Sequence, residues 1–360
     1  MPRNVWFAAT CLLVLFALIF YQTDQPRTQA VQPLAQSETQ TPSQVEIPEP
    51  IASQSDTGAS GQSAVEVLSN TEDDLEHTRK GFAEAEGFLF FVDAPWGSNK
   101  EAYHLTTEEQ FQAQVTAGNF QKHPVTGRLT CLVDYIQVPC NDGGATTFQL
   151  DTGKEAKFSV ELPNLSVGLH DLILLTFFNP DEHSTETRFR QNSRFMYHFY
   201  RTTIYVGEKA NQPSVRYTQF VEDDPLAQKG INIFTASKSR LEDPWQTPWH
   251  VEDALTGQHI SYFVRWNNTQ PTINTFALIA FLNFEQVPLQ SADPVLYGRF
   301  EPHKQANIAA QFQVPKEPGQ AEFLVLLVEN PYLALDQQAE KETPQPFFVF
   351  SSDRVLVNVQ

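Results

Sequence analysis

Positive charge is scarce in this sequence. The 360 residues include 24 Lys and Arg against 43 Asp and Glu, which gives a formal net charge of −19 at pH 7. A nucleic-acid-binding protein needs a basic surface to displace counterions from phosphate, and an anionic membrane surface makes the same demand. The composition therefore argues against nucleic acid as a partner and against a general attraction to anionic lipid.

Short motifs of common active sites are also missing. The sequence contains no Gly-x-Ser-x-Gly, no His-Glu-x-x-His, no Walker loop and no Gly-x-Gly-x-x-Gly after a predicted strand. The acidic pairs Asp223-Asp224 and Glu242-Asp243 lie beside proline in predicted loops, where so acidic a protein commonly places carboxylates. We therefore expect a protein that is not an enzyme and has neither a cofactor nor a resident metal.

Methionine and cysteine are rare, whereas phenylalanine is abundant. There are 2 Met and 3 Cys, but 28 Phe, 24 Pro and 16 Gly. Aromatic residues favour strands, and Pro and Gly favour turns. The composition predicts a β-rich protein, and the length leaves room for two domains of ordinary size.

One apolar run, residues 5–21, is long enough to be a membrane span. A helix of that length measures about 25 Å, at the short end for the hydrocarbon core. A cleaved secretory signal and an uncleaved signal-anchor both fit. Residues 22–26 lack a small-x-small cleavage site, and Arg3 precedes the run. We predict a transmembrane signal-anchor within residues 1–22, which makes this a single-pass membrane protein whose later residues are extracytoplasmic.

The stretch that follows, residues 23–80, contains no Phe, Tyr or Trp and is rich in Gln, Ser, Thr, Pro and Ala. Such a composition cannot bury enough apolar surface to offset the entropy lost on ordering. We predict a disordered acidic linker.

The rest of the chain repeats itself. The apolar run at residues 172–178 ends in Asn179-Pro180, and the run at residues 323–328 is followed by Asn330-Pro331. Several other landmarks recur in the same order at an offset between 149 and 151: Gln137-Val138-Pro139 with Gln286-Val287-Pro288, Gly168 with Gly319, and Ile204-Tyr205-Val206 with Val355-Leu356-Val357. A nearly constant offset indicates a tandem duplication.

Each copy contains about seven short predicted strands separated by turn signals, which is typical of an antiparallel β-sandwich. The predicted strands are residues 88–92, 111–115, 128–134, 148–150, 156–162, 172–178 and 202–206, then 231–234, 260–266, 276–282, 295–300, 308–314, 323–328 and 355–359. In number and spacing the strands resemble the immunoglobulin or fibronectin type III superfold. We predict an all-β fold with domains at residues 81–210 and 211–360. A fold-level resemblance carries no function.

Cys131 and Cys140 suggest a disulfide. A continuous strand would hold them roughly 30 Å apart, too far to bond. A two-residue turn centred on Tyr135-Ile136 would place one directly across from the other. Such a pair oxidises outside the cytoplasm, where it would add about 2–3 kcal/mol in the chain-entropy model. Pro139 and the unusual turn dipeptide weigh against this arrangement.

Two loops of the first copy, residues 118–127 and 179–198, should meet at one end of its sandwich. The second loop is longer and more charged than a connection needs, which indicates a binding surface. The candidate binding residues are Lys122, His123, Asp181, Glu182, His183, Arg188 and Arg190. A solvated loop without a ligand is the alternative. A metal site using His123, Asp181 and His183 has no supporting spacing.

The sequence therefore predicts a membrane-anchored extracytoplasmic protein with a non-catalytic role in binding, adhesion or envelope assembly. Its partner would be a protein or a glycan outside the membrane. Two alternatives stay open: a hydrolase-type enzyme with its site at the junction of the domains or in the loops of the first domain, and a purely structural spacer.

Overall fold

The computed structural model describes residues 79–81, 87–141, 146–186, 189–190, 197–207, 212–219, 233–237, 249–267, 274–289, 293–301, 305–338, 341 and 345–360. The predicted signal-anchor and nearly all of the predicted linker lie outside these residues. Among the residues described, no helix is both long enough and apolar enough to span a bilayer.

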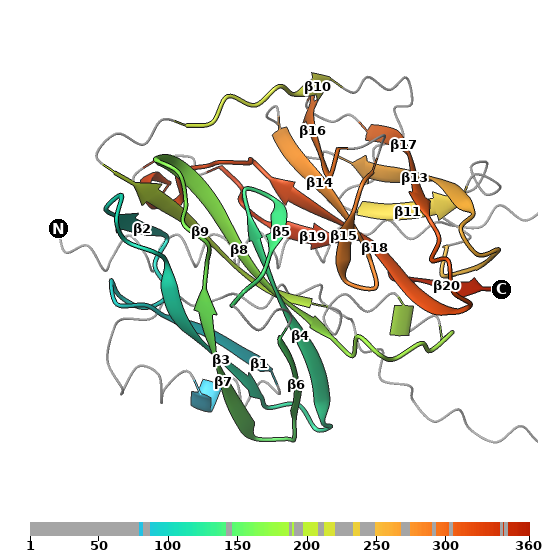
Figure 1. Cartoon of the computed structure of the whole chain (residues 1–360), viewed down its shortest axis with the longest axis horizontal. Coiled ribbons are helices and arrows are strands. Elements are labelled where there is room, and N and C mark those ends of the chain that lie inside the picture. The colour runs from blue at the N-terminus through green and yellow to red at the C-terminus, as the bar shows by residue number, and fades with distance from the viewer. Residues whose placement is uncertain are drawn as a thin grey trace, which may run out of the picture. The chain divides into compact units, whose positions relative to one another are not determined.

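The first half of the described chain forms two sheets (Figure 1). A three-stranded sheet has the order β1-β3-β7, and a larger sheet has the order β2-β9-β8-β4-β5 with β6 also paired to β4. The strands are β1 (Phe88–Asp93), β2 (Ala102–Leu105), β3 (Gln112–Asn119), β4 (Val125–Val133), β5 (Ile136–Val138), β6 (Thr146–Leu150), β7 (Lys154–Glu161), β8 (Gly168–Phe178) and β9 (Tyr197–Val206).

The second half repeats this plan. Its small sheet has the order β11-β13-β17, and its large sheet has the order β10-β16-β14-β18-β20-β12, with β15 on β14 and β19 on β18. The strands are β10 (Thr218–Gln219), β11 (Ile233–Ser237), β12 (Val251–Ala254), β13 (His259–Asn267), β14 (Asn274–Leu282), β15 (Glu285–Val287), β16 (Val295–Phe300), β17 (Gln305–Gln313), β18 (Gly319–Glu329), β19 (Val349–Ser351) and β20 (Val355–Val359). A 3₁₀ turn covers Leu335–Gln337.

These sheets confirm the predicted all-β class and the β-sandwich in each copy. Six short strands were not predicted. Strands β5, β10, β15 and β19 have only two or three residues. Strands β2 and β12 have four residues each and pair in parallel with a distant strand, β9 or β20. The last strand of the first half is continuous, whereas its counterpart is divided into β19 and β20. Ser352 lies at the break, where its hydroxyl accepts a hydrogen bond from the backbone N–H of Val325 at 2.9 Å.

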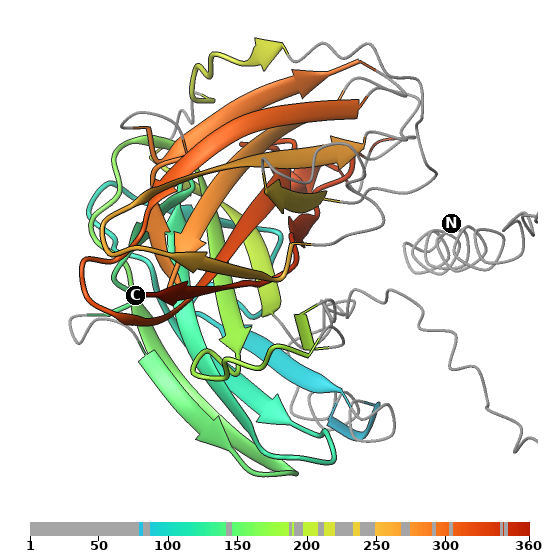
Figure 2. The same ribbon diagram turned by 90° about the vertical axis from the view of Figure 1, so that its right-hand side faces the viewer.

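The predicted strand before Asn179 is central in its sheet and buried on both faces. All residues of β8 are buried, and β8 lies between β9 and β4 in its sheet. One face of β8 packs in the core of its own sandwich, through residues such as Leu172 and Leu174. The other face packs against the large sheet of the second half, through residues such as Ile173 and Leu175. The strands therefore form four layers, small sheet, large sheet, large sheet and small sheet (Figure 2).

The turn after β4 differs from the prediction. Val133 pairs with Ile136, so the two central residues are Asp134 and Tyr135, one position earlier than predicted. Both have positive φ, 51° and 68°, which is the conformation of a type I′ turn. Asn283 and Phe284 have the same conformation in the second half. Aromatic side chains are unusual at such a position, and both are used in the contact between the halves.

The predicted disulfide is confirmed in spite of the shifted turn. Cys131 pairs with Val138 in the ladder, and Cys140 lies two residues farther on. The two Cα atoms are 5.3 Å apart and the sulfurs are bonded. Both cysteines are buried in the core of the first sandwich. The bond joins β4 to the segment that precedes β6.

A glycine and a phenylalanine face each other across the same pair of strands in both halves, but in exchanged positions. Gly127 on β4 pairs with Phe148 on β6, and Phe276 on β14 pairs with Gly298 on β16. A Cβ atom added to Gly127 would lie 2.3 Å from the Phe148 ring, and one added to Gly298 would lie 1.9 Å from the Phe276 ring. Each site therefore has room for one ring, supplied from either strand.

Candidate functional site

The two halves meet in a seam built from the outer faces of their large sheets. Its apolar part is one cluster of buried side chains contributed by both halves. These are Leu132, Tyr135, Leu169, Ile173, Leu175, Phe177 and Tyr205 from the first half, and Ala277, Ile279, Phe281, Phe284, Leu324, Leu326, Val328, Tyr332 and Val349 from the second. A seam with this much buried apolar area behaves as a core shared by both halves.

Gln137 and Gln286 make reciprocal contacts across the seam. The backbone N–H of Gln137 donates to Oε1 of Gln286 at 2.7 Å, and the backbone N–H of Gln286 donates to Oε1 of Gln137 at 2.6 Å. Each side-chain amide also donates to a turn carbonyl of the other half, that of Phe284 or Tyr135. The halves are therefore related here as the two subunits of an isologous dimer would be.

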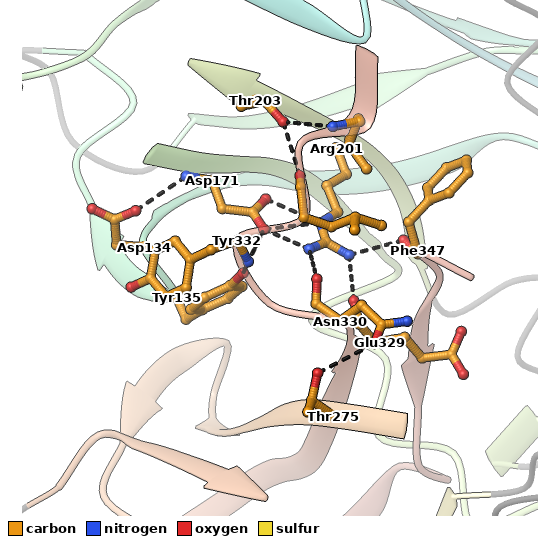
Figure 3. A network of polar contacts seen from close by, with 12 residues as sticks. Asp134, Tyr135, Asp171, Arg201, Thr203, Thr275, Glu329, Asn330, Tyr332 and Phe347 are labelled. Atoms are coloured by element: carbon orange, nitrogen blue, oxygen red, sulfur yellow. Dashed lines mark hydrogen bonds and ion pairs between the residues drawn. The ribbon is translucent and has the colours of Figure 1, made fainter. Parts of the chain in front are cut away.

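A buried ion pair lies at the same seam (Figure 3). The guanidinium of Arg201, which is fully buried, binds the carboxylate of Asp171 through Nε and Nη2. Its remaining N–H groups cross to the second half and donate to the carbonyls of Glu329, Asn330 and Phe347. Burial alone would lower the pKa of Arg201, but the charge of Asp171 raises it above its ordinary value. The guanidinium therefore stays protonated, and the pair ties β9 to the end of β18.

The hydroxyl of Tyr135 completes this network. It donates to Oδ2 of Asp171 and accepts the backbone N–H of Tyr332 at 2.7 Å. Burial, and then the negative charge of Asp171, raise the pKa of Tyr135 well above its ordinary value. The phenol is therefore held as a neutral donor, and Asp134 in the same turn accepts the backbone N–H of Asp171 at 3.0 Å.

A second buried carboxylate, Glu322, lies at the matching place in the second half. It binds Arg190 through Nη1, with both side chains fully buried, and lies 3.0 Å from Nδ1 of His183. Nε of Arg354 lies 3.4 Å from the same carboxylate. The guanidinium of Arg354 then donates to the carbonyls of Phe178 and Asn179 in the first half.

The two predicted loop ranges touch at Thr126 and Asn179. The backbone N–H of Asn179, the first residue after β8, donates to the carbonyl of Thr126 in β4 at 2.9 Å. Lys122, His123, Asp181 and Glu182 have exposed side chains.

The other candidate residues are placed differently. His183 and Arg190 point inward to Glu322 and form part of the seam. Arg188 lies outside the described residues. In the described part of the chain, no three His, Cys, Asp or Glu side chains gather as a metal site would require.

An open hollow lies where these loops meet the edge of the large sheet. Its volume is about 300 Å³, and it is open to solvent. It is lined by residues of β4, of β6 and of the loop after β8: Thr126, Gly127, Thr147, Phe148, Gln149, Pro180 and Asp181. Thr147, Gln149 and Asp181 are exposed. The hollow thus includes one residue, Asp181, of the predicted binding set.

The place in the second half that corresponds to the hollow, here called the filled corner, is occupied by tyrosine rings. Thr275 corresponds to Thr126, and its hydroxyl donates to Asn330 at 3.2 Å as that of Thr126 donates to Asn179 at 3.4 Å. Two small or polar residues of the first half correspond to rings in the second. Thr147, which pairs with Arg128, corresponds to Tyr297, which pairs with Ala277. Asp181 corresponds to Tyr332, two positions after the repeated asparagine.

A further ring, that of Tyr217, lies on the filled corner. Its centroid is 6.2 Å from that of Tyr297. Burial raises the pKa of Tyr217, and a hydrogen bond with the side chain of Thr275 acts in the opposite direction. Tyr217 comes from the segment that leads into β10, and β10 pairs in parallel with β16. The second half is thus covered at this corner by the chain that precedes it.

Four charged residues of the seam were not predicted from the sequence: Asp171, Arg201, Glu322 and Arg354. A signal for them was present, because a carboxylate interrupts each long apolar strand at matching positions, Asp171 and Glu322, 151 residues apart. A buried carboxylate needs a cationic partner. Arg201 and Arg354 are the arginines near the end of each copy, but only the fold shows that they contact the opposite half.

Comparisons with known proteins add no family. No family model matches the chain, and no curated protein matches it. Among solved structures, a red sea bream transglutaminase aligns with 81% of this chain and 34% of its own length, at 11% identity and a TM-score of 0.22. A CARDB domain from Pyrococcus furiosus aligns over 39% of this chain and 99% of its own length, at 8% identity and a TM-score of 0.23. An Escherichia coli alpha-2-macroglobulin aligns with 77% of this chain, at 9% identity and a TM-score of 0.24, but the match covers only 17% of that protein.

Proposed function

We propose that this protein is a membrane-anchored, extracytoplasmic binding protein with no catalytic activity. Residues 5–21 would anchor it, and a linker would separate the anchor from a rigid pair of β-sandwiches. The observation that carries the proposal is the difference between two equivalent corners. One corner is filled by Tyr217 and Tyr297, while the other is open. In the first half the hollow is open, and in the second half the equivalent site is filled by the chain itself. The open hollow is therefore suited to binding a partner.

The arrangement of the seam supports a structural use of its ionisable groups. Asp171 and Glu322 are buried and bonded to arginines. Arg201 and Arg354 are in turn bonded to backbone carbonyls of the opposite half. A catalytic acid or base has to reach a substrate, and these groups are enclosed by packed side chains. The seam therefore favours rigidity over a hydrolase site at the junction, which remains the rival function.

Crosslinking in native membranes tests the proposal. The full chain, with a photoreactive amino acid at an exposed loop position such as Glu182, is irradiated in its own membranes and purified. We expect one protein or glycan from the extracytoplasmic side to be captured in stoichiometric amounts. A chain with the probe at exposed Thr107, on the opposite end of the first half, is the control. Equal captured material from both positions, or none from either, would contradict a binding function.

A further inference from the structure

The hollow on the first half is the structural counterpart of the place that Tyr217 occupies on the second half. The walls correspond one by one: Thr126 to Thr275, Asn179 to Asn330, and Thr147 to Tyr297. In the second half the occupant arrives as an extended segment. Val215 and Tyr217 face the protein while Arg216 is exposed, and the next two residues form β10 beside β16.

The edge of the first sheet can accept a strand in the same way. In the described part of the chain, β6 pairs with β4 alone, whereas its counterpart β16 pairs with both β14 and β10. An extended peptide adds readily to a strand edge, because main-chain hydrogen bonds give affinity and side-chain pockets give specificity. The hollow lies beside this edge and includes Phe148 and Gln149 of β6.

We propose that the hollow binds a tyrosine side chain of an extended segment of a second protein, which adds as a strand beside β6. This inference rests on the proposed binding function and names its partner class. The tyrosine ring would lie against Thr147, and its hydroxyl would reach Thr126 as that of Tyr217 reaches Thr275.

The chain itself does not supply this tyrosine from the segment that precedes the first half. Residues 23–80 contain no aromatic residue. The second half is covered by a segment that starts just after the first half ends and carries Tyr217, 16 residues before Ile233, the first residue of β11. Residues 23–80 therefore offer no ring for the hollow, and we assign the ring to another molecule.

Charge further defines the partner segment. Where the second half has Tyr332, the first half has Asp181, and Glu182 beside it is also exposed. A basic residue next to the tyrosine would lie near these carboxylates, as Arg216 lies next to Tyr217 in the chain's own segment. Electrostatic complementarity of this kind speeds association and selects among partners.

The hollow is continuous with the established seam, which holds its walls in place. Arg128, two residues from Thr126, forms an ion pair with Glu285 and donates to the carbonyl of Asn283. On the other side, Arg354 donates to the carbonyl of Asn179, directly before Pro180. A pocket whose walls are fixed before binding loses less entropy when a ligand enters.

The test uses the full chain in mild detergent and a labelled heptapeptide with the sequence of residues 213–219, Pro-Ser-Val-Arg-Tyr-Thr-Gln. This segment already occupies the equivalent corner, so it carries the features that the hollow should recognise. We expect saturable binding by fluorescence anisotropy, and a loss of roughly tenfold or more when the peptide tyrosine is replaced by alanine, as for a buried aromatic anchor. Absence of saturable binding overturns the proposal.

Two protein variants locate the binding. Thr147→Arg fills the hollow and should abolish peptide binding, whereas Thr107→Arg adds the same charge at an exposed position on the opposite end of the first half and should leave binding unchanged. A peptide with a photoreactive group in place of its tyrosine should crosslink to the hollow, at residues 126–127, 147–149 or 180–181. Crosslinks confined to other segments overturn the assignment.

Failure here is distinguishable from failure of the proposed function. Suppose a partner is captured in native membranes and Thr147→Arg does not reduce its yield. This result would support the binding function and would contradict the assignment of the hollow as the binding site. Capture of a protein whose crosslinked segment contains tyrosine next to a basic residue, and whose yield falls at least tenfold with Thr147→Arg, supports the assignment. Capture of a glycan alone at the hollow contradicts it.

Discussion

Arg201 and Arg354 each donate hydrogen bonds to backbone carbonyls of the opposite half. Arg201 binds the carbonyls of Glu329 and Asn330 in the second half, and Arg354 binds the carbonyls of Phe178 and Asn179 in the first. In each case the arginine holds the last residue of the long central strand and the asparagine after it. The repeated Asn-Pro ends are therefore recognised across the seam, and each half fixes the loop that leaves the other.

Loss of Arg201 should destabilise the protein strongly. The Arg201→Leu variant leaves Asp171 buried without its cation, which costs about 3–5 kcal/mol for a buried pair. Arg128→Leu is the matched control, since its partner Glu285 is largely exposed and the expected loss is below about 1 kcal/mol. Urea denaturation of the full chain in mild detergent measures both. Similar losses for the two variants would mean that the buried pair has no special importance.

Exchange of a glycine and a phenylalanine should be tolerated in the first half. Gly127→Phe alone brings a second ring against Phe148 and should cost about 1–3 kcal/mol or more through overpacking. The double variant Gly127→Phe/Phe148→Gly reproduces the arrangement of the second half, where Phe276 faces Gly298, and should recover most of the loss. A double-mutant cycle from denaturation curves gives the coupling. Additive effects of the two changes would contradict the idea of one ring per site.

The disulfide should be present in the mature protein. Mass spectrometry of a proteolytic digest without reductant should recover Cys131 and Cys140 as one linked species. Because the closed loop is short, Cys131→Ala/Cys140→Ala should cost about 2–3 kcal/mol. The second half lacks the bond, having Ala280 and Leu289 at the matching positions, so the variant should still fold. Recovery of two free thiols would contradict this prediction.

Stability should fall in mild acid because of His198. This side chain is buried beside Phe88 and Phe90, and burial lowers its pKa to about 4. The imidazole is protonated near pH 6.5 in the unfolded chain but only near pH 4 in the folded chain. The contribution of His198 to the free energy of unfolding is therefore fully present above about pH 6.5 and is lost as the pH falls from 6.5 to 4. The loss approaches about 3 kcal/mol.

The variant His198→Phe isolates this contribution. It should flatten the pH dependence of unfolding free energy between pH 6.5 and 4, when compared with the unmodified chain under the same conditions. His170 has the opposite effect on the pH dependence of the unfolding free energy, because its pKa is raised in the folded chain. Burial alone would lower its pKa, but hydrogen bonds to Asp134 and to the carbonyl of Ser166 outweigh this and raise it. An equally steep loss in the His198→Phe chain would assign the acid sensitivity to other groups.

Local patterns predicted the parts of the fold that rest on local physics. The apolar run that forms β8 is long and ends in Asn-Pro, so both its burial and its end could be predicted. The turn at Asp134 and Tyr135 was misplaced by one residue, because a tyrosine with positive φ is not favoured by turn chemistry. Its ring is required by the seam, through Asp171 and Tyr332, and the seam is a contact between residues far apart in sequence.

The candidate site was predicted only in part. Exposed loop residues such as Asp181 could be found from charge and loop length, but a charged residue in a long loop can equally turn inward. His183 and Arg190 did so, because Glu322 of the other half requires partners. The hollow depends on the size difference between Thr147 and Tyr297, which becomes visible only when the strand register aligns the two copies.

Fusion of the two copies into one chain has a consequence for valency. In a homodimer with the same isologous seam, a change at one corner would appear at both, and both corners would be open or closed together. Here one corner carries Tyr297 and Tyr217 and the other carries Thr147. If the proposed function holds, each molecule would offer one open corner and engage one partner, and any gain in avidity would have to come from the density of molecules in the membrane.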